Sequence, residues 1–215
     1  MCVICVSEKG VRQPNEQEIR YMWSSNPHGA GYMFARDGKV EIHKGFMDIK
    51  DFLRSVNGEG FTADDVVVYH FRISTQAGVT PEMTHPFPLS GDLEDMKILD
   101  CLCDVGIAHN GIIHLTSNND KEYSDTALFV ADYLSYIIRD TRDITDKHVK
   151  NIIKELAGSK LVLLNGDGEL SIIGEFYKNK SESGDLLFSN MTHAHIGFRR
   201  TWNLTDIYGY RKAHA

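Results

Sequence analysis

The sequence is poor in proline and cysteine, and it lacks any long apolar run. Five prolines and four cysteines occur among 215 residues, so neither a proline-rich linker nor a disulfide scaffold is expected. Without about 20 consecutive apolar residues, a membrane-spanning helix is excluded. The apolar start of the chain is short and has no basic residues before it, unlike a signal peptide. We therefore expect a reduced, cytoplasmic protein without membrane contact.

An excess of positive charge is also missing. Acidic residues outnumber basic residues by 30 to 23, which gives a formal net charge of −7. A scattered, net acidic charge opposes contact with phosphate backbones, so nucleic acid is not an expected partner. The hydrophobic content of 42% and the length fit one globular domain, or one domain with a tail.

The spacing of apolar residues predicts a mixture of strands and helices. Two hairpins are expected, one around Asp37-Gly38 and one around Asn165 to Gly168. The expected strands are residues 2–7, 31–35, 39–44, 66–71, 105–108, 161–164, 170–173 and 186–189, and the expected helices are residues 16–23, 49–56, 124–138 and 146–156. Strands dominate both ends with helices between them, which indicates the α+β class rather than alternating βαβ units.

The second residue, Cys2, is a candidate nucleophile. Removal of Met1 would leave Cys2 with a free α-amino group of pKa about 7.7–8.0, close to the thiol value of about 8.5. One terminal residue can then act as both nucleophile and base. Taken alone, a second-position cysteine is more often a small buried side chain. Its interpretation therefore depends on the motifs that follow.

Four polar motifs follow Cys2 in a fixed order. A strand ends in His70-Phe71-Arg72-Ile73-Ser74-Thr75, and His85-Pro86, His109-Asn110-Gly111 and Ser124-Asp125-Thr126 come after it. With the leading cysteine, this series resembles the motifs of the class II glutamine amidotransferases. No single tripeptide is specific to that family, but the ordered set is. The resemblance spans about residues 2–126, and a Phe188-Ser189-Asn190 strand extends it.

The resemblance implies the four-layer αββα sandwich of the N-terminal-nucleophile hydrolases and a reaction on glutamine. Cys2 would attack the side-chain amide and form a γ-glutamyl thioester, which water then hydrolyses. The Asn110 side chain and the Gly111 backbone N–H would stabilise the oxyanion. This chemistry requires no cofactor and no metal. By itself, Asn110-Gly111 would be read as an ordinary turn.

The resemblance also assigns residues to the substrate. Arg72 would hold the glutamine carboxylate by a planar two-point contact that lysine does not reproduce, and Asp125 would pair with the ammonium group. Thr75 and His85 would line the pocket. Each has a structural alternative: a salt bridge for Arg72, a helix first turn for Asp125, and ordinary turn positions for Thr75 and His85.

The same resemblance predicts a domain at residues 2–198 and a tail at residues 199–215. Many members fuse this domain to a synthase, whereas about ninety residues follow the matched region here. We therefore expect glutamine as substrate and a separate ammonia-accepting synthetase or transferase as partner. Many members continue after Thr75 with His-Gly, but this chain has Gln76-Ala77-Gly78. Two alternatives stay open: a hydrolase of another γ-glutamyl amide, and a non-catalytic binding subunit that retains the fold.

The remaining cysteines and the last histidine pair are candidate metal ligands. On a strand, Cys5 would face away from Cys2, and we assign it to the core. Cys101-Leu102-Cys103 places two thiols on one face of a possible strand without an evident histidine or acidic partner. His193-Ala194-His195 is more typical of a polar strand or loop. We predict no metal site at either pair.

Overall fold

The computed structural model describes residues 2–73, 79–116, 122–178, 185–192 and 211–213, and it confirms a mixed fold of helices and antiparallel sheets. The strands are β1 (Val3–Ser7), β2 (Ala30–Arg36), β3 (Lys39–Phe46), β4 (Val67–Phe71), β5 (Phe87–Pro88), β6 (Asp100–Cys103), β7 (Val105–Asn110), β8 (Lys160–Asn165), β9 (Leu170–Ile173), β10 (Phe176–Lys178), β11 (Leu187–Phe188) and β12 (Arg211–Ala213). The helical segments are α1 (Glu16–Ser25), α2 (Ile49–Glu59), η1 (Pro81–Met83), η2 (Leu93–Lys97), α3 (Asp125–Phe129), η3 (Val130–Leu134), α4 (Ser135–Ile137), η4 (Thr141–Thr145) and α5 (Lys147–Ala157).

The strands form two sheets, and the first strand is interior to the larger one. The larger sheet has the order β12-β10-β11-β1-β4-β2-β3-β6, and the smaller sheet has the order β5-β7-β8-β9. In the ladder between β1 and β4, Val3 pairs with Phe71, and on the other side of β1, Cys5 pairs with Phe188. The start of β1 therefore meets the end of β4 within the sheet.

Local signals in the sequence account for most element boundaries. The β2–β3 hairpin turns at Asp37 and Gly38, with φ of 52° and 75°, the left-handed values expected of an Asp-Gly turn. Asn15 caps α1 in a reciprocal capping box with Glu18. Helix α5 begins after Asp146, whose carboxylate accepts two backbone N–H bonds, and ends at a left-handed glycine.

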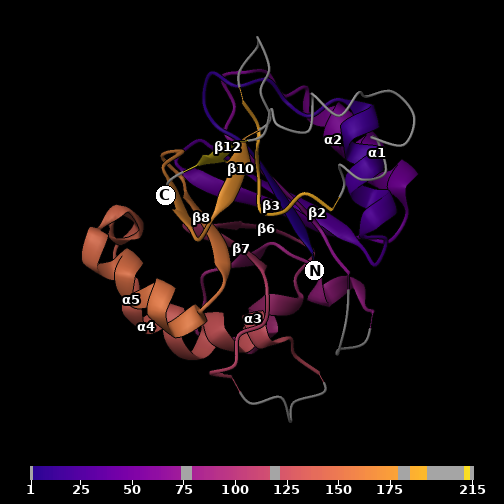
Figure 1. Cartoon of the computed structure of the whole chain (residues 1–215). Helices are drawn as coiled ribbons and strands as arrows, with labels where there is room; N and C mark the ends of the chain where they lie inside the picture. Colours follow the sequence, from indigo (N-terminus) through magenta and orange to yellow (C-terminus); the bar gives the residue numbers. More distant parts are fainter. Residues whose placement is uncertain (1, 74–78, 117–121, 179–184, 193–210, 214–215) are drawn as a thin grey trace.

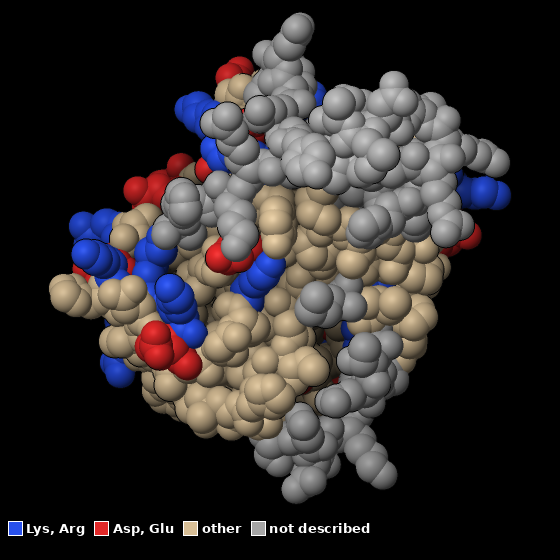
Figure 2. Space-filling model, viewed as in Figure 1, with Lys and Arg blue, Asp and Glu red and all other residues tan. Residues whose placement is uncertain are grey.

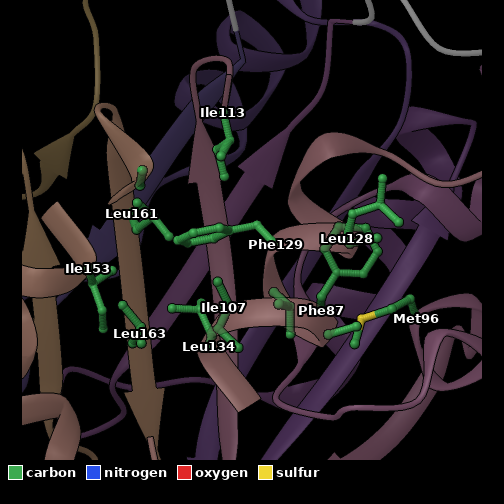
Figure 3. Close-up of a cluster of buried hydrophobic side chains, with 14 of the residues drawn as sticks. Phe87, Met96, Ile107, Ile113, Leu128, Phe129, Leu134, Ile153, Leu161 and Leu163 are labelled. Carbon is green, nitrogen blue, oxygen red and sulfur yellow. The ribbon is translucent and has the colours of Figure 1, made fainter. Parts of the chain in front are cut away.

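Three clusters of buried apolar side chains hold the elements together. In the first, residues of α1 and α2 pack on the larger sheet, for example Met22 and Phe52 against Tyr32. In the second, larger-sheet residues such as Ile42 contact smaller-sheet residues such as Val162. The third joins the smaller sheet to α3–α5 and is drawn in Figure 3, where the Phe129 ring lies between the side chains of the neighbouring strands. Figure 1 shows α1 and α2 together on one side of the strands and α3–α5 on the other.

Two expected elements differ from the prediction. The strand expected at residues 105–108 continues to Asn110, because His109 and Asn110 stay in the ladder opposite Leu161 and Lys160. The helix expected at residues 124–138 is divided by the π-helical segment η3, so its periodicity is not that of one regular helix. Strands β5 and β10 were not predicted, since each is only two or three residues long.

The end of the chain is described only in part. Of residues 199–215, the structure describes Arg211–Ala213, which pairs with β10 as strand β12. The division into a domain at 2–198 and a tail at 199–215 stays a prediction.

The described surface mixes charges of both signs. In Figure 2, basic side chains lie beside acidic ones on the left of the view, where Figure 1 places α5. Within the described ranges, no helix has the length and apolar character needed to cross a membrane.

Candidate active site

The site forms where four elements end or begin. Antiparallel pairing of β1 with β4 brings Cys2, just before Val3, next to Arg72, just after Phe71. Strand β7 of the smaller sheet ends at Asn110. Three of the residues predicted to act in catalysis and substrate binding therefore lie at neighbouring strand ends, although they come from distant parts of the sequence.

Cys2 is half-buried at the start of β1. Its Sγ donates to the carbonyl oxygen of Ile73 at 3.7 Å, and its own carbonyl oxygen accepts a hydrogen bond from the Asn190 side-chain amide. Burial raises the pKa of the Cys2 thiol, and a backbone hydrogen bond at Ile73 and the positive charge of Arg72 oppose that rise. The thiol is therefore positioned but mainly protonated at neutral pH.

Arg72 connects the nucleophile to the acidic residue of the predicted pocket. Its backbone N–H donates to the carbonyl oxygen of Gly29 at 2.8 Å, and its carbonyl oxygen accepts from the His28 N–H at 2.9 Å. The side chain is 5% exposed. Burial lowers the pKa of Arg72, while Cys2 and Asp125 raise it. The Arg72 guanidinium thus lies within electrostatic reach of both the Cys2 thiol and the Asp125 carboxylate.

Asp125 is the first residue of α3, the helix first-turn position that was the structural alternative to substrate binding. Ser124 caps the helix by accepting from the Ala127 N–H at 3.2 Å. The two carboxylate oxygens of Asp125 accept from the backbone N–H groups of Ile113 and Thr126, each at 2.8 Å. A carboxylate has about four acceptor sites, so these bonds leave capacity for a substrate ammonium group.

Asn110 is hydrogen-bonded to β1 through Ser189, a residue of the expected Phe188-Ser189-Asn190 strand to which the sequence assigned no role. The Asn110 Nδ2 donates to Ser189 Oγ at 2.8 Å, and the same oxygen accepts from the Ile4 backbone N–H at 2.8 Å. Within the described chain, the buried Asn110 Oδ1 has no hydrogen-bond partner. The polar Ser189-Asn190 pair directly after an apolar strand was the available signal for this contact.

Gly111 occupies a position that requires glycine. Its φ is +153°, and a Cβ there would lie 2.5 Å from the Cβ of Ser159. Its neighbour His109 bridges two elements, with Nδ1 2.7 Å from Thr126 Oγ1 and Nε2 2.8 Å from Ser159 Oγ. Burial lowers the pKa of His109 to about 4. A neutral His109 therefore fixes the chain just before the Asn110-Gly111 pair.

His85 lies in a group of buried histidines beside the site. Its ring centroid is 4.3 Å from that of His70 and 4.8 Å from that of Phe87. Among the described residues neither His85 ring nitrogen has a partner, and burial holds its pKa well below the usual value. The pocket-lining role of His85 stays a prediction. Thr75 falls outside the described residues, as do Gln76, Ala77 and Gly78.

A buried lysine is a second feature that the sequence reasoning missed. Lys44, on β3, is 3% exposed, and its Nζ donates to the carbonyl oxygens of Glu82 at 2.8 Å and Met96 at 2.5 Å. The ammonium also lies 4.0 Å from the centroid of the Phe87 ring. Burial lowers the pKa of Lys44 to about 7. This lysine ties the segments on either side of Phe87 to the larger sheet.

The described side chains include no group of three or more histidine, cysteine, aspartate or glutamate residues arranged to hold a metal ion. The side chains gathered at the site supply a half-buried thiol, a guanidinium, a carboxylate and a carboxamide. Cys5 is fully buried in the cluster between the larger sheet and its helices, as predicted.

Solved structures of two other proteins have a similar fold. Glutamine phosphoribosylpyrophosphate amidotransferase from B. subtilis, in complex with ADP and GMP, has a TM-score of 0.51 and 13% identity over 91% of this chain. The chain shares the fold of a glutamine amidotransferase. A second structure, of the allosteric regulatory enzyme of purine biosynthesis, has a TM-score of 0.52 and 15% identity over 91% of this chain. This amidotransferase-like chain spans 43% of each of those chains. No family model and no curated protein matches the sequence.

Proposed function

We propose that this chain is a class II glutamine amidotransferase domain that releases ammonia from the glutamine side-chain amide. The observation that carries the proposal is the convergence of Cys2, Arg72 and Asp125 at the ends of β1 and β4 and the start of α3. A thiol nucleophile, a cation for a carboxylate and an anion for an ammonium group are the three groups that attack on free glutamine needs. The similar fold of a glutamine amidotransferase supports the same reaction class.

The substrate would be held at its amino-acid end by two charged residues. Arg72 would bind the α-carboxylate in a planar two-point contact, and Asp125 would accept hydrogen bonds from the α-ammonium group. Thr75 and His85 would line the rest of the pocket. Binding both charges of the substrate places the side-chain amide at a fixed distance from them, which supports attack at that amide rather than at other amides.

The nucleophile would become active once Met1 is removed. The α-amino group of Cys2, with a pKa of about 7.7–8.0, would then take the thiol proton directly or through one water. A base is needed because burial raises the pKa of this thiol. The thiolate attacks the amide carbon, the amine returns the proton to the leaving nitrogen, and ammonia departs. Water then hydrolyses the γ-glutamyl thioester to glutamate, and Cys2 is regenerated.

Negative charge on the amide oxygen would be met by Asn110 and Gly111. The Ser189 hydroxyl accepts from Ile4 and still has its own proton to donate. A rotation of the Asn110 amide by about 180° would exchange its oxygen and nitrogen atoms. Oδ1, which has no partner in the described chain, would then accept a hydrogen bond from the Ser189 hydroxyl. The NH₂ group would take the former position of Oδ1 and supply N–H donors to the oxyanion. Loss of one such donor lowers the turnover rate by about 10²–10³.

The four-layer αββα sandwich belongs to the same proposal. The three apolar clusters support it, since each joins two successive layers of helix or sheet. We also propose that a separate synthetase or transferase accepts the ammonia. Co-purification of such an enzyme with the tagged protein tests this part, and fast ammonia release by the isolated protein without any such partner would contradict it.

The deciding experiment is labelling with a glutamine-mimicking electrophile, followed by mapping of the adduct. We expect one adduct on Cys2, glutamate release from glutamine, and loss of both in Cys2→Ser. Cys101→Ser is the matched control, since Cys101 is also a half-buried free thiol and should change neither. An adduct on Cys101 or Cys103 in place of Cys2 would overturn the assignment.

Two further measurements identify the amide substrate and show whether Met1 is removed. Comparing glutamate release from glutamine and from larger γ-glutamyl amides separates the proposed reaction from hydrolysis of another γ-glutamyl amide. Intact mass shows whether Met1 is removed. A protein that keeps Met1 and shows no turnover with any of these substrates would favour the non-catalytic binding subunit.

A further inference from the structure

Two thiols lie side by side at the rim of the larger sheet, away from the proposed reaction. Cys101 and Cys103 are on β6, the last strand of that sheet in the described chain. They pair with Ile42 and Val40 of β3, so both thiols face the cluster between the two sheets and are half-buried against it. Leu102, between them, faces the opposite side and is 67% exposed.

The contacts of the two sulfur atoms are unequal. Cys103 Sγ donates to the carbonyl oxygens of Val105 at 3.3 Å and Val40 at 3.7 Å. The neighbouring Cys103 thiol lowers the pKa of Cys101, and the positive charge of Lys44 lowers it further. The neighbouring Cys101 thiol and burial raise the pKa of Cys103. Cys101 is thus the more nucleophilic of the pair.

We propose that Cys101 and Cys103 form a reversible disulfide, in which Cys101 attacks a small-molecule disulfide and Cys103 resolves the product. The pair has the features of a redox-active site: a partly accessible thiol, a second thiol on the same face of the strand, and a nearby lysine. Neither thiol is used by the proposed amidotransferase reaction, and the inference does not depend on that reaction.

The reaction balances with glutathione disulfide as the oxidant. The Cys101 thiolate attacks one sulfur of glutathione disulfide, and one glutathione leaves as a thiolate that takes up a proton. Cys103, after losing its proton to solvent, attacks Cys101 Sγ and releases the second glutathione. The protein pair loses two electrons and two protons, and glutathione disulfide is reduced to two thiols.

The position on a sheet rim makes the bond possible but easily reduced. Residues i and i+2 of a strand are about 6.4–6.8 Å apart between Cα atoms, at the upper end of the range of about 4.4–6.8 Å that disulfides span. In the described chain β6 pairs with β3 alone, so it can shift toward the shorter separation without breaking a second ladder. A disulfide that requires the two Cα atoms to move closer together is strained, and strained disulfides are reduced more easily.

The test uses the native, reduced protein in glutathione buffers of increasing disulfide content, followed by acid quenching and alkylation with N-ethylmaleimide. Trypsin releases residues 98–121 as one peptide that holds both thiols, since it cleaves after Lys97 and after Lys121 and no lysine or arginine lies between them. We expect two maleimide groups on this peptide in reducing buffer. In oxidising buffer we expect none, with a mass lower by two hydrogen atoms than that of the unalkylated reduced peptide.

Two single variants test the assigned roles. Cys103→Ser should accumulate a glutathione adduct on Cys101, because the resolving thiol is missing. Cys101→Ser should form its adduct several-fold more slowly, because the remaining Cys103 thiol donates to two backbone carbonyl oxygens and must leave them to attack. Equal rates in the two variants would overturn the assignment of the attacking thiol. Full alkylation of the wild-type peptide in every buffer would overturn the disulfide itself.

Discussion

Replacement of Ser189 by alanine is the perturbation that tests the architecture of the site most directly. The Ser189 hydroxyl accepts from the backbone N–H of Ile4 and from the side chain of Asn110, both at 2.8 Å. Ser189 and Ile4 are 0% exposed and Asn110 is 3% exposed. Water cannot replace the lost hydroxyl without entering the packed region between β1, β7 and the segment after β11. Both donors would therefore lose their partner.

The cost follows from two unpaired donors. A buried polar group left without its hydrogen bond costs about 1–3 kcal/mol. Two such groups, partly relieved by rotation of the Asn110 amide, should lower the free energy of unfolding by about 2–4 kcal/mol. This is large for the removal of one oxygen atom, since substitutions away from such contacts usually change stability by about 0.5 kcal/mol or less.

Ser171→Ala is the matched control. Ser171 lies on β9 and is 1% exposed, but its hydroxyl has no hydrogen-bond partner within the described chain. Removing it deletes a buried polar group that nothing satisfies, so Ser171→Ala should be neutral or stabilising by about 1 kcal/mol. The two variants remove the same hydroxyl oxygen from nearly equally buried positions, and they differ in the hydrogen bonds they break.

Urea unfolding of both variants gives the measurement. The urea midpoint of Ser189→Ala should fall, while the slope of its free energy of unfolding against urea concentration stays unchanged. The urea midpoint of Ser171→Ala should stay the same or rise. Glutaminase turnover of Ser189→Ala should also fall by about tenfold or more at an unaltered KM, because a mispositioned oxyanion donor affects the transition state rather than binding. Equal stability losses in the two variants would refute the reasoning from hydrogen bonds.

Three further predictions concern binding, backbone conformation and pH. Arg72→Lys should raise KM for glutamine by about tenfold or more with a smaller change in kcat, because lysine keeps the charge and loses the two-point contact; steady-state kinetics check this, and an unchanged KM would contradict the carboxylate role. Gly111→Ala should destabilise the protein and abolish turnover, since the added Cβ would lie 2.5 Å from the Cβ of Ser159. Gly58→Ala is the control: Gly58 lies in α2, and no atom is within 4 Å of the added Cβ. This variant should raise the free energy of unfolding by about 0.5–1 kcal/mol, as measured by thermal unfolding. Burial lowers the pKa of His70 to about 3 and of His109 to about 4, so on acidification these histidines are protonated in the unfolded chain before they are protonated in the folded protein. Below about pH 6.5, each histidine should therefore lower the free energy of unfolding by up to about 1.4 kcal/mol per pH unit, until the pH reaches its folded pKa. A urea midpoint that stays constant from pH 7 to pH 5 would rule this out.

The sequence predicted the regular elements well where the signal was local. Asp37-Gly38 predicts a tight hairpin because both residues tolerate positive φ, and the hairpin is there. The end of β7 was placed too early, since His109-Asn110-Gly111 has the composition of a turn. Pairing with β8 keeps His109 and Asn110 in the strand, and contacts with distant residues satisfy their side chains. Propensity alone does not contain that information.

The main residues of the candidate site, Cys2, Arg72 and Asp125, were proposed from the order of their motifs, and their roles stay predictions. The structure places Arg72 within electrostatic reach of Cys2 and of Asp125. Ser189 was named only as part of an expected strand and was given no role, although its hydroxyl accepts a hydrogen bond from Asn110. Its two contacts join residues 185 and 79 positions apart, and no local pattern reports a hydrogen bond over such separations. Lys44 was missed for the same reason, since its partners are backbone carbonyl groups, which carry no sequence signal.

Burial links the fold to the chemistry of Cys2. The strand pairing that places this thiol beside Arg72 also removes it from water, and burial outweighs the favourable charge, so that the net pKa is raised. The fold by itself therefore produces a positioned thiol rather than a thiolate. Reactivity at neutral pH then requires a base at the same residue, which an α-amino group would provide and an amide bond to Met1 would not. A protein with Met1 retained should thus keep its stability and lose its reactivity toward the electrophile, and equal labelling of both forms would show that the base lies elsewhere.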